Sequence, residues 1–464
     1  MSPFTWSDRT VREALGLRTD VTLEEDRVYG GVSTDSRRAA EADLYVALIG
    51  ERFDGHDFVA DALAAGAGGA VVSHPVVGAE RVALYPVEDT LEALGRLARH
   101  RRDALPARVV GITGSTGKTG TKDMTAAALA TTLRVHATLQ NLNNRVGVPL
   151  TLLSAPEDAD AVVVEMGTNE PGEIEALTRV ARPDVAVITT VGESHLEGLG
   201  SVEGVLREKL DLVRGIDPER SVVIVGDTPP SLARTARQIH PRVRAAGLSD
   251  EADEDLRAEG VEPGTGGRYT FRWRGGTVEL SVPGRHAVAN AVLALAVADA
   301  LGVPAEEAAA GLATVEPGTM RGELRRVGDL TLVLDCYNAN PQSVRAAMDL
   351  LEDHPHVGRR VVVLGTMLEL GASSDELHRE VLLDVLARNV DVAALVGGFA
   401  RAEASLRRAG DLPQDAPEIV AAETPEAAYR KLSGHLRGGE LVLLKASRGV
   451  ALEALLPLFE EEHG

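Results

Sequence analysis

The chain has 464 residues, which is more than one ordinary hydrophobic core supports, so its length predicts two or three domains. Its 70 acidic and 48 basic residues give a net charge of -22, which repels phosphate backbones and argues against general nucleic-acid binding. The hydrophobic content of 44% is that of a globular protein, and a single cysteine, Cys336, excludes an internal disulfide.

Short β-branched runs alternate with longer helical patterns through most of the chain, which predicts an α/β fold with mainly parallel sheets. In the first section, strand-like runs at 43–49, 69–73 and 82–87 predict a small α/β domain, residues 1–87. Nothing near the N-terminus joins a basic segment to an apolar run as a secretion signal would, so we expect a cytoplasmic protein.

A helix expected at 90–102 opens a second domain, residues 88–317, with strands predicted at 109–113, 161–165, 185–190 and 222–225. Each of these runs lies close to a chemically unusual residue, and open parallel sheets bind ligands beyond the carboxyl ends of their strands. The longest apolar stretch, 287–303, contains Asn290 and Asp299 and is shorter than the roughly 20 residues that span a bilayer. We interpret it as a buried helix and expect no stable membrane insertion.

A third series of strand-like runs, at 330–334, 360–364, 392–396 and 441–445, predicts a Rossmann-like domain, residues 318–464. A Pro-Gly segment at 316–319 lies at its start. We expect this segment to act as a hinge that brings the third domain against the central domain.

The strongest local signal is the sequence G-I-T-G-S-T-G-K-T at 111–119, between a predicted strand and a helical pattern that begins near Thr121. Its glycines leave backbone amides free to face a triphosphate, Lys118 supplies positive charge, and the Thr119 hydroxyl can bind Mg²⁺. The expected phosphate-binding residues are Gly114, Ser115, Thr116, Gly117, Lys118, Thr119 and Gly120.

A phosphate loop alone would also suit a GTPase, an ATPase motor or a kinase. The guanine-reading pattern of Asn or Thr, then Lys, any residue and Asp does not occur. The nearest approach, at 208–211, begins with Glu208. ATP is therefore preferred over GTP.

Three further side chains are candidates for a metal site. Glu165 ends a predicted strand, where a carboxylate can bind the Mg²⁺ of a nucleotide, although a solvated acid would also fit there. His195 lies in the loop after the 185–190 strand, where a lone histidine is more often structural. Lys209 lies in the apolar stripe of a helix expected at 201–215, so it either snorkels to water or adds carbon dioxide to form a metal-binding carbamate.

These motifs occur in the order found in the Mur ligases of peptidoglycan synthesis, and the chain resembles that family from about residue 30 to about residue 455. The resemblance implies a three-domain α/β enzyme that uses ATP and two Mg²⁺ ions. Within it, Lys118, Glu165, His195 and Lys209 match catalytic positions, and Lys209 matches the lysine that becomes carbamylated. The implied metal ligands are Thr119, Glu165, His195 and carbamylated Lys209.

The resemblance also implies binding residues in each domain. The residues that match the UDP-substrate segments are Ser33, Asp35, Ser36, Arg37, Asp54 and His56. Those that match the substrate loop and the peptide end are Asn141, Asn143, Asn144 and Asn340, although Asn340-Pro341 would also suit a helix cap. Those that match the nucleotide motifs are His286, Asn290, Arg321, Asp335 and Asn338. Cys336 and Thr366 depart mildly from the family pattern.

Three segments resemble the dipeptide-adding member of the family: N-A-N-P at 338–341, N-L-N-N at 141–144 and M-L-E-L-G at 367–371. The implied reaction adds D-alanyl-D-alanine to UDP-N-acetylmuramoyl-tripeptide through an acyl phosphate, by an enzyme that we expect to be a monomer with small-molecule substrates. The alternatives are a sister ligase that adds the third amino acid, a folylpolyglutamate-type ligase, and a P-loop ATPase switch without a ligase reaction.

Overall fold

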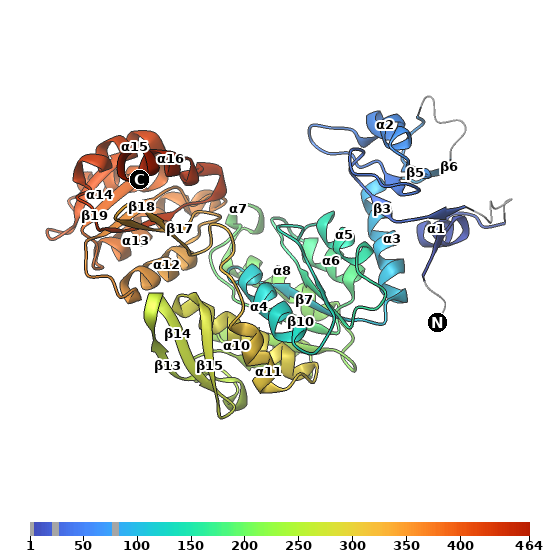
Figure 1. Ribbon diagram of the computed structural model, residues 1–464, viewed down its shortest axis with the longest axis horizontal. Helices are drawn as coiled ribbons and strands as arrows, with labels where there is room; N and C mark the ends of the chain where they lie inside the picture. Colours follow the sequence, from blue (N-terminus) through green and yellow to red (C-terminus); the bar gives the residue numbers. More distant parts are fainter. Residues whose placement is uncertain (1–3, 21–26, 77–82) are drawn as a thin grey trace.

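The computed structural model describes residues 4–20, 27–76 and 83–464. Its N-terminal and third domains lie at opposite ends of the molecule, with the central domain between them (Figure 1). Each domain is built on a sheet with parallel strands, so the expected α/β class is confirmed. Within the described ranges, no helix has both the length and the apolar character needed to cross a membrane.

The N-terminal domain contains a four-stranded parallel sheet of β3 (Val32–Ser33), β4 (Leu44–Val46), β5 (Gly69–Val72) and β6 (Ala83–Pro86). A short antiparallel pair, β1 (Trp6–Ser7) and β2 (Val28–Tyr29), adjoins α1 (Asp8–Leu15), and α2 (Val59–Ala64) precedes β5. The strand expected at 43–49 is shorter than predicted, and Val82 lies outside the described residues. The helix expected at 90–102 is confirmed as α3 (Thr90–Ala104), whose Asp89 cap accepts hydrogen bonds from Leu91 N and Glu92 N.

The central domain has a six-stranded parallel sheet in the order β12-β11-β10-β7-β9-β8. The strands are β7 (Arg108–Thr113), β8 (Val135–Ala137), β9 (Ala161–Glu165), β10 (Val185–Ile188), β11 (Val222–Gly226) and β12 (Val243–Ala246). Because β7 pairs with both β9 and β10, Thr113, Glu165 and Ile188 end at one edge of the sheet. This shared edge places the phosphate loop beside the segments that carry Glu165 and His195.

Helices cover both faces of this sheet, as expected for a parallel sheet with βαβ connections (Figure 1). They are α4 (Lys118–Ala130), α5 (Gly147–Leu153), α6 (Glu173–Ala181), α7 (Leu196–Leu199), α8 (Val202–Arg214), α9 (Pro230–Ile239), α10 (Arg285–Ala300) and α11 (Ala305–Leu312). The buried helix expected at 287–303 is confirmed as α10, which ends three residues earlier, and its side chains pack into the core around β7 and β10.

The sequence did not predict a three-stranded antiparallel sheet in the central domain, of β13 (Glu259–Pro263), β14 (Arg268–Trp273) and β15 (Gly276–Pro283). Its buried Tyr269, Phe271 and Trp273 alternate with polar residues and pack against α10. That alternation is the period-two signal of a half-buried strand, so it could have revealed β14.

The third domain contains a six-stranded sheet in the order β16-β17-β21-β18-β19-β20, in which only β16 is antiparallel to its neighbour. Its strands are β16 (Glu323–Val327), β17 (Leu330–Asp335), β18 (Arg360–Leu364), β19 (Val392–Val396), β20 (Glu418–Ala422) and β21 (Leu441–Lys445). Its helices are α12 (Pro341–Asp353), α13 (Ser374–Leu386), α14 (Gly398–Ala409), α15 (Pro425–Leu432) and α16 (Leu456–His463). Cys336, just after β17, is fully buried, and burial raises the pKa of its thiol to about 11.

Candidate active site

The phosphate loop joins β7 to α4 in a conformation that requires its glycines. Gly114 has φ +151°, and a Cβ there would lie 1.9 Å from Thr189 Oγ1. Gly117 has φ +80° and precedes the first residue of α4. The loop is also anchored to the end of β10, because Thr189 Oγ1 donates to Thr116 O at 2.5 Å and Ser115 N donates to Thr190 O at 2.9 Å. The first turn of α4 therefore presents backbone amides in a fixed geometry suited to an anion.

The helix after the loop begins at Lys118, three residues before the expected start near Thr121. The predicted start lies too far along the chain, because Lys118 and Thr119 directly follow the left-handed Gly117 and already belong to the helix. Lys118 Nζ lies across the loop and donates to Gly114 O at 2.7 Å. Desolvation lowers the pKa of Lys118, while the charge of Glu165 opposes that shift.

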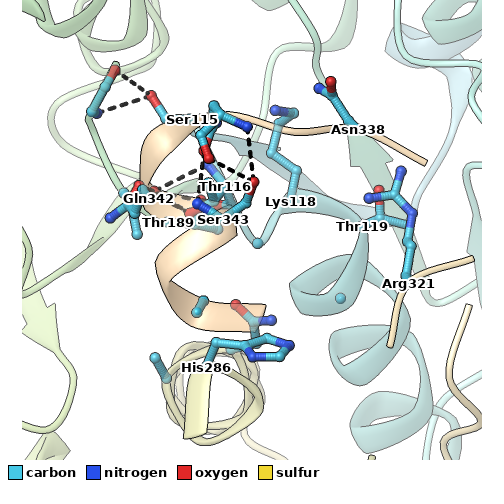
Figure 2. Close-up of a pocket in the computed structure, with 18 of the residues that line it drawn as sticks. Ser115, Thr116, Lys118, Thr119, Thr189, His286, Arg321, Asn338, Gln342 and Ser343 are labelled. Carbon is cyan, nitrogen blue, oxygen red and sulfur yellow. Dashed lines mark hydrogen bonds between the residues drawn. The ribbon is translucent and has the colours of Figure 1, made fainter. Parts of the chain in front are cut away.

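A cavity of about 850 Å³ opens between the central and third domains beside this loop, a size typical of small-molecule sites. Figure 2 shows Lys118, Thr119, His286, Arg321 and Asn338 around one space. The predicted site residues that line the cavity are Ser115, Thr116, Gly117, Lys118, Thr119, Gly120, Asn143, Asn144, Glu165, His195, His286, Asn290, Arg321, Asp335, Asn338 and Asn340.

Glu165 ends β9 and is only 2% exposed. Asn143 Nδ2 donates to its Oε1 at 2.9 Å, whereas its Oε2 is buried without a hydrogen-bond partner. A solvated acid is therefore the wrong interpretation of Glu165. A buried carboxylate oxygen that lines a cavity beside a phosphate loop has the chemistry of a Mg²⁺ ligand.

His195 precedes α7 with a left-handed backbone, φ 52°, a conformation that costs of order 1–3 kcal/mol for a residue with a side chain. It lines the cavity, and its Nδ1 lies 2.6 Å from Oε2 of Glu369 in the third domain. The two atoms are close, although their orientation does not meet hydrogen-bond geometry. This close contact with His195 lowers the pKa of Glu369. Glu369 was not among the predicted site residues, although it belongs to the M-L-E-L-G segment.

Lys209 lies on α8 with 0% of its side chain exposed, and its Nζ has no hydrogen-bond partner. The snorkelling interpretation is therefore wrong. Burial and the neighbouring charge of Lys118 place the pKa of Lys209 well below its ordinary value. The charges of Glu208 and Glu173 oppose this shift without cancelling it. The Glu208 carboxylate forms no hydrogen bond to Lys209 and instead accepts from Gly172 N and Ile174 N at 2.7 and 2.8 Å at the start of α6. A neutral amine, rather than an ammonium ion, is the form of lysine that can add carbon dioxide to give a carbamate.

Lys209 is covered by protein and does not itself line the cavity. Its charge is coupled to that of Lys118 and Glu173, both of which line it. The Lys209 amine therefore lies just behind the wall of the cavity.

The third domain contributes basic and amide side chains to the cavity, Arg321 and Asn338 among them. The Arg321 guanidinium stacks on the Tyr337 ring, 3.9 Å from its centroid, which fixes its plane. Lys445 Nζ lies 2.8 Å from Asp335 Oδ2 and also donates to Asn338 O at 2.8 Å. These contacts hold the segment after β17 in place.

The N-terminus of α12 carries one expected and one unexpected residue. Asn340 forms a capping box: its Oδ1 accepts from Ser343 N at 2.8 Å, and Ser343 Oγ accepts from Asn340 N at 2.9 Å. Gln342 was not predicted, yet its Oε1 accepts from Thr116 Oγ1 at 3.1 Å and Thr190 Oγ1 at 3.3 Å (Figure 2). This glutamine connects the third domain directly to the phosphate loop.

Three family models match consecutive parts of the chain. They describe the catalytic domain of the Mur ligase family at 28–102, the Mur ligase middle domain at 112–298 and the glutamate ligase domain of Mur ligases at 320–448. A UDP-N-acetylmuramoyl-tripeptide--D-alanyl-D-alanine ligase from Bacillus subtilis is 36% identical over 93% of each chain. The chain belongs to the Mur ligase family.

Solved structures of Mur ligases share the whole architecture. A crystal structure of MurF from Acinetobacter baumannii has a TM-score of 0.87 and 30% identity, covering 99% of this chain and 100% of that one. MurF from Thermotoga maritima in complex with ADP has a TM-score of 0.80 and 28% identity, covering 93% and 97%. The three-domain Mur ligase architecture is thus confirmed.

In this Mur ligase, several predicted residues do not line the cavity: Ser33, Asp35, Ser36, Arg37, Asp54, His56, Gly114, Asn141 and Lys209. In the N-terminal domain, Arg37 forms two 2.9 Å hydrogen bonds to the Asp35 carboxylate, and Asp54 accepts from His56 N at 2.9 Å. His56 uses both ring nitrogens, on Asp54 and on Ser73 N. The six N-terminal-domain residues thus form polar turns in a domain that lies away from the phosphate loop (Figure 1).

Proposed function

We propose that this Mur ligase joins D-alanyl-D-alanine to UDP-N-acetylmuramoyl-tripeptide, with ATP converted to ADP and phosphate, in the synthesis of a peptidoglycan precursor. One observation carries the proposal: a phosphate loop, the buried carboxylate of Glu165 and third-domain Arg321 line a single cavity. Relatives that bear this activity in their names match over nearly the full length of the chain.

The cavity residues fit a nucleotide with Mg²⁺. Thr119, Glu165 and His195 would hold the metal, together with Lys209 once it is carbamylated. Mg²⁺, when bound, neutralises charge on the phosphates. His286 and Asn290 would lie on the adenine side, and Asp335 and Asn338 would bind the ribose and phosphates. Lys118 and Arg321 would approach the β- and γ-phosphates with positive charge.

The reaction proceeds in two steps. The terminal carboxylate of the tripeptide attacks the γ-phosphorus of ATP, so that an acyl phosphate forms and ADP leaves. The amine of D-alanyl-D-alanine then attacks the acyl carbon, and the tetrahedral intermediate expels phosphate as the amine releases its proton. In both steps the protein has to position the reacting groups and stabilise their negative charge, and it does not have to supply a nucleophile.

We further propose that the long substrate bridges the N-terminal and central domains. Its UDP end would bind Ser33, Asp35, Ser36, Arg37, Asp54 and His56, and its peptide end Asn141, Asn143, Asn144 and Asn340. The distance of the N-terminal turns from the cavity suits such an extended molecule. The domains would be residues 1–87, 88–317 and 318–464, in a cytoplasmic monomer.

The test is phosphate release from the purified chain with ATP, UDP-N-acetylmuramoyl-tripeptide and D-alanyl-D-alanine, omitting each in turn. We expect phosphate only with all three present. Phosphate release without the amine would favour an ATPase switch. Release with a single amino acid and the shorter dipeptide substrate, or with a folate and glutamate, would favour a sister ligase.

A further inference from the structure

One acidic residue from the third domain reaches a cavity residue of the central domain. Glu369 follows β18 by five residues, and its Oε2 lies 2.6 Å from Nδ1 of His195. Its side chain is 50% exposed, whereas that of His195 is 14% exposed. A half-exposed carboxylate could instead be solvated by water. Its contact with His195 therefore indicates that the surrounding backbone directs the Glu369 side chain toward the histidine.

The backbone around this pair is strained on both sides of the interface. His195 has φ 52° and Glu369 has φ 62°, so both adopt the left-handed region that normally favours glycine. Such outliers persist only where neighbouring structure imposes them, and they concentrate at functional sites. Because the two residues face each other, we attribute both left-handed conformations to the same contact between the domains.

The main chains of the segments that carry His195 and Glu369 are also joined by a hydrogen bond. Glu197 N donates to Glu369 O at 3.1 Å. A Cβ on Gly371 would lie 3.1 Å from Glu197 Cα, so a side chain there would press the two loops slightly apart. The Glu369–His195 contact is therefore part of a defined interface between the third and central domains.

We propose that Glu369 is a positioning residue that orients His195 and thereby couples the metal site to the docking of the third domain. This inference rests on the proposed function of His195 as a metal ligand. When Nδ1–H donates to Glu369, the Nε2 lone pair is the one left for a cation. Metal-bound histidines characteristically donate their other N–H to such a carboxylate, which fixes the tautomer and the ring plane.

The direct test is Mn²⁺ binding to the full chain in the presence of ADP, followed by the electron paramagnetic resonance signal of free Mn²⁺. Glu369→Ala should weaken Mn²⁺ binding about 10- to 100-fold. Glu369→Gln, whose amide oxygen still accepts from Nδ1, should lie between Glu369→Ala and the wild type. Glu197→Gln removes one negative charge from the same interface without contacting His195, and should bind Mn²⁺ within about twofold of the wild type.

A double-mutant cycle establishes whether Glu369 acts through His195. If it does, Glu369→Ala combined with His195→Ala binds Mn²⁺ no more weakly than His195→Ala alone. Equal Mn²⁺ affinity of Glu369→Ala and the wild type, or fully additive losses in the double variant, would overturn the inference. Glu369→Gln keeps the test decisive if the alanine variant melts early.

The same preparations distinguish this inference from the proposed function. Wild-type phosphate release with the three substrates reports on the ligase reaction, whereas Mn²⁺ affinity reports on His195 and its partner without turnover. A wild type that fails to form the amide, together with a Glu369→Ala variant that binds Mn²⁺ weakly, would sink the ligase proposal alone. An active wild type with unchanged Mn²⁺ binding in Glu369→Ala would sink the positioning role alone.

Discussion

Lys209 is a buried amine with no hydrogen-bond partner among the described residues. Its nearest acid in sequence, Glu208, is occupied by backbone amides of α6. A protonated lysine in that position would be an uncompensated buried charge, which is among the most destabilising features a core can contain. The buried Lys209 amine therefore lowers the stability of the free enzyme, because folding removes it from water and from its proton.

Replacing Lys209 by methionine should stabilise the free protein while abolishing the ligase reaction. In carbon-dioxide-free buffer at pH 7, we expect Lys209→Met to raise the free energy of unfolding by about 1–4 kcal/mol. Denaturant unfolding monitored by circular dichroism measures the change. Lys431→Met, at an exposed lysine whose Nζ donates to Ala421 O at 2.6 Å, should not stabilise the protein and should lower the free energy of unfolding by at most about 1 kcal/mol.

The pH dependence of this difference has a definite sign. The folded-state pKa of Lys209 is depressed from its ordinary value of 10.5, so between the two values the unfolded chain binds a proton that the folded chain does not. Wild-type stability should then rise with pH relative to Lys209→Met, and the advantage of the variant should vanish as pH approaches 10.5. A constant difference across this window would contradict the assignment.

At the level of single residues, the sequence predicted what depends on local pattern. Lys209 was expected in an apolar stripe because helical periodicity placed it there, and Glu165 was expected at a strand end because three valines precede it. Gln342 and Glu369 could not be assigned these contacts in advance. Their partners, Thr116 and His195, lie 226 and 174 positions away, and only the docking of two domains brings them together.

Among the elements, α12 shows how one side chain can serve two purposes. Asn340 caps the helix through Ser343 and also lines the cavity. Asn340→Ala should lower the free energy of unfolding by about 1 kcal/mol, because a capping oxygen is lost. Asn340→Ser should retain most of that stability, since serine is also a good cap.

The pair of variants separates the cap from the proposed substrate contact. If Asn340 also binds substrate, Asn340→Ser should keep its melting temperature yet lose kcat/KM for phosphate release. Equal kcat/KM for Asn340→Ser and the wild type would assign the residue to capping alone.

The elements that the sequence predicted best are those buried on both faces. β9, β10 and β19 consist wholly of buried residues, so continuous apolar runs were sufficient to find them. The strand expected at 185–190 is observed as β10, which ends at Ile188, two residues before the predicted end. Thr189 and Thr190 leave the strand and form hydrogen bonds to the phosphate loop. β13, largely exposed, and β16, which has three exposed residues, carried no such signal.

For the molecule as a whole, the third domain is docked on the central domain through scattered polar contacts and through one buried apolar cluster that includes Leu196 and Leu370. The polar contacts include Gln342 with Thr116, Glu369 with His195, and the Tyr269 hydroxyl with the Asp353 carboxylate. Polar contacts of this kind, which contribute about 0.5–1.5 kcal/mol each, can be broken and re-formed during turnover. We therefore expect a population of undocked molecules in solution.

Gln342→Ala should enlarge that population, because it removes two hydrogen bonds to the central domain. We expect a larger radius of gyration for this variant by small-angle X-ray scattering, and a decrease toward the wild-type value when ATP analogue and tripeptide substrate are added. Gln238→Ala, at an exposed site on α9, should scatter like the wild type. One unchanged shape under all conditions would exclude hinge motion at 316–319.

The isolation of Cys336 has a practical consequence for following such motion. A lone thiol that is fully buried, with a pKa raised to about 11, should stay unreactive toward maleimide at neutral pH. Pairs of cysteines introduced at exposed positions of two domains would then carry fluorescent dyes without background labelling. Single-molecule energy transfer could time each opening and closing of the enzyme in an otherwise native chain.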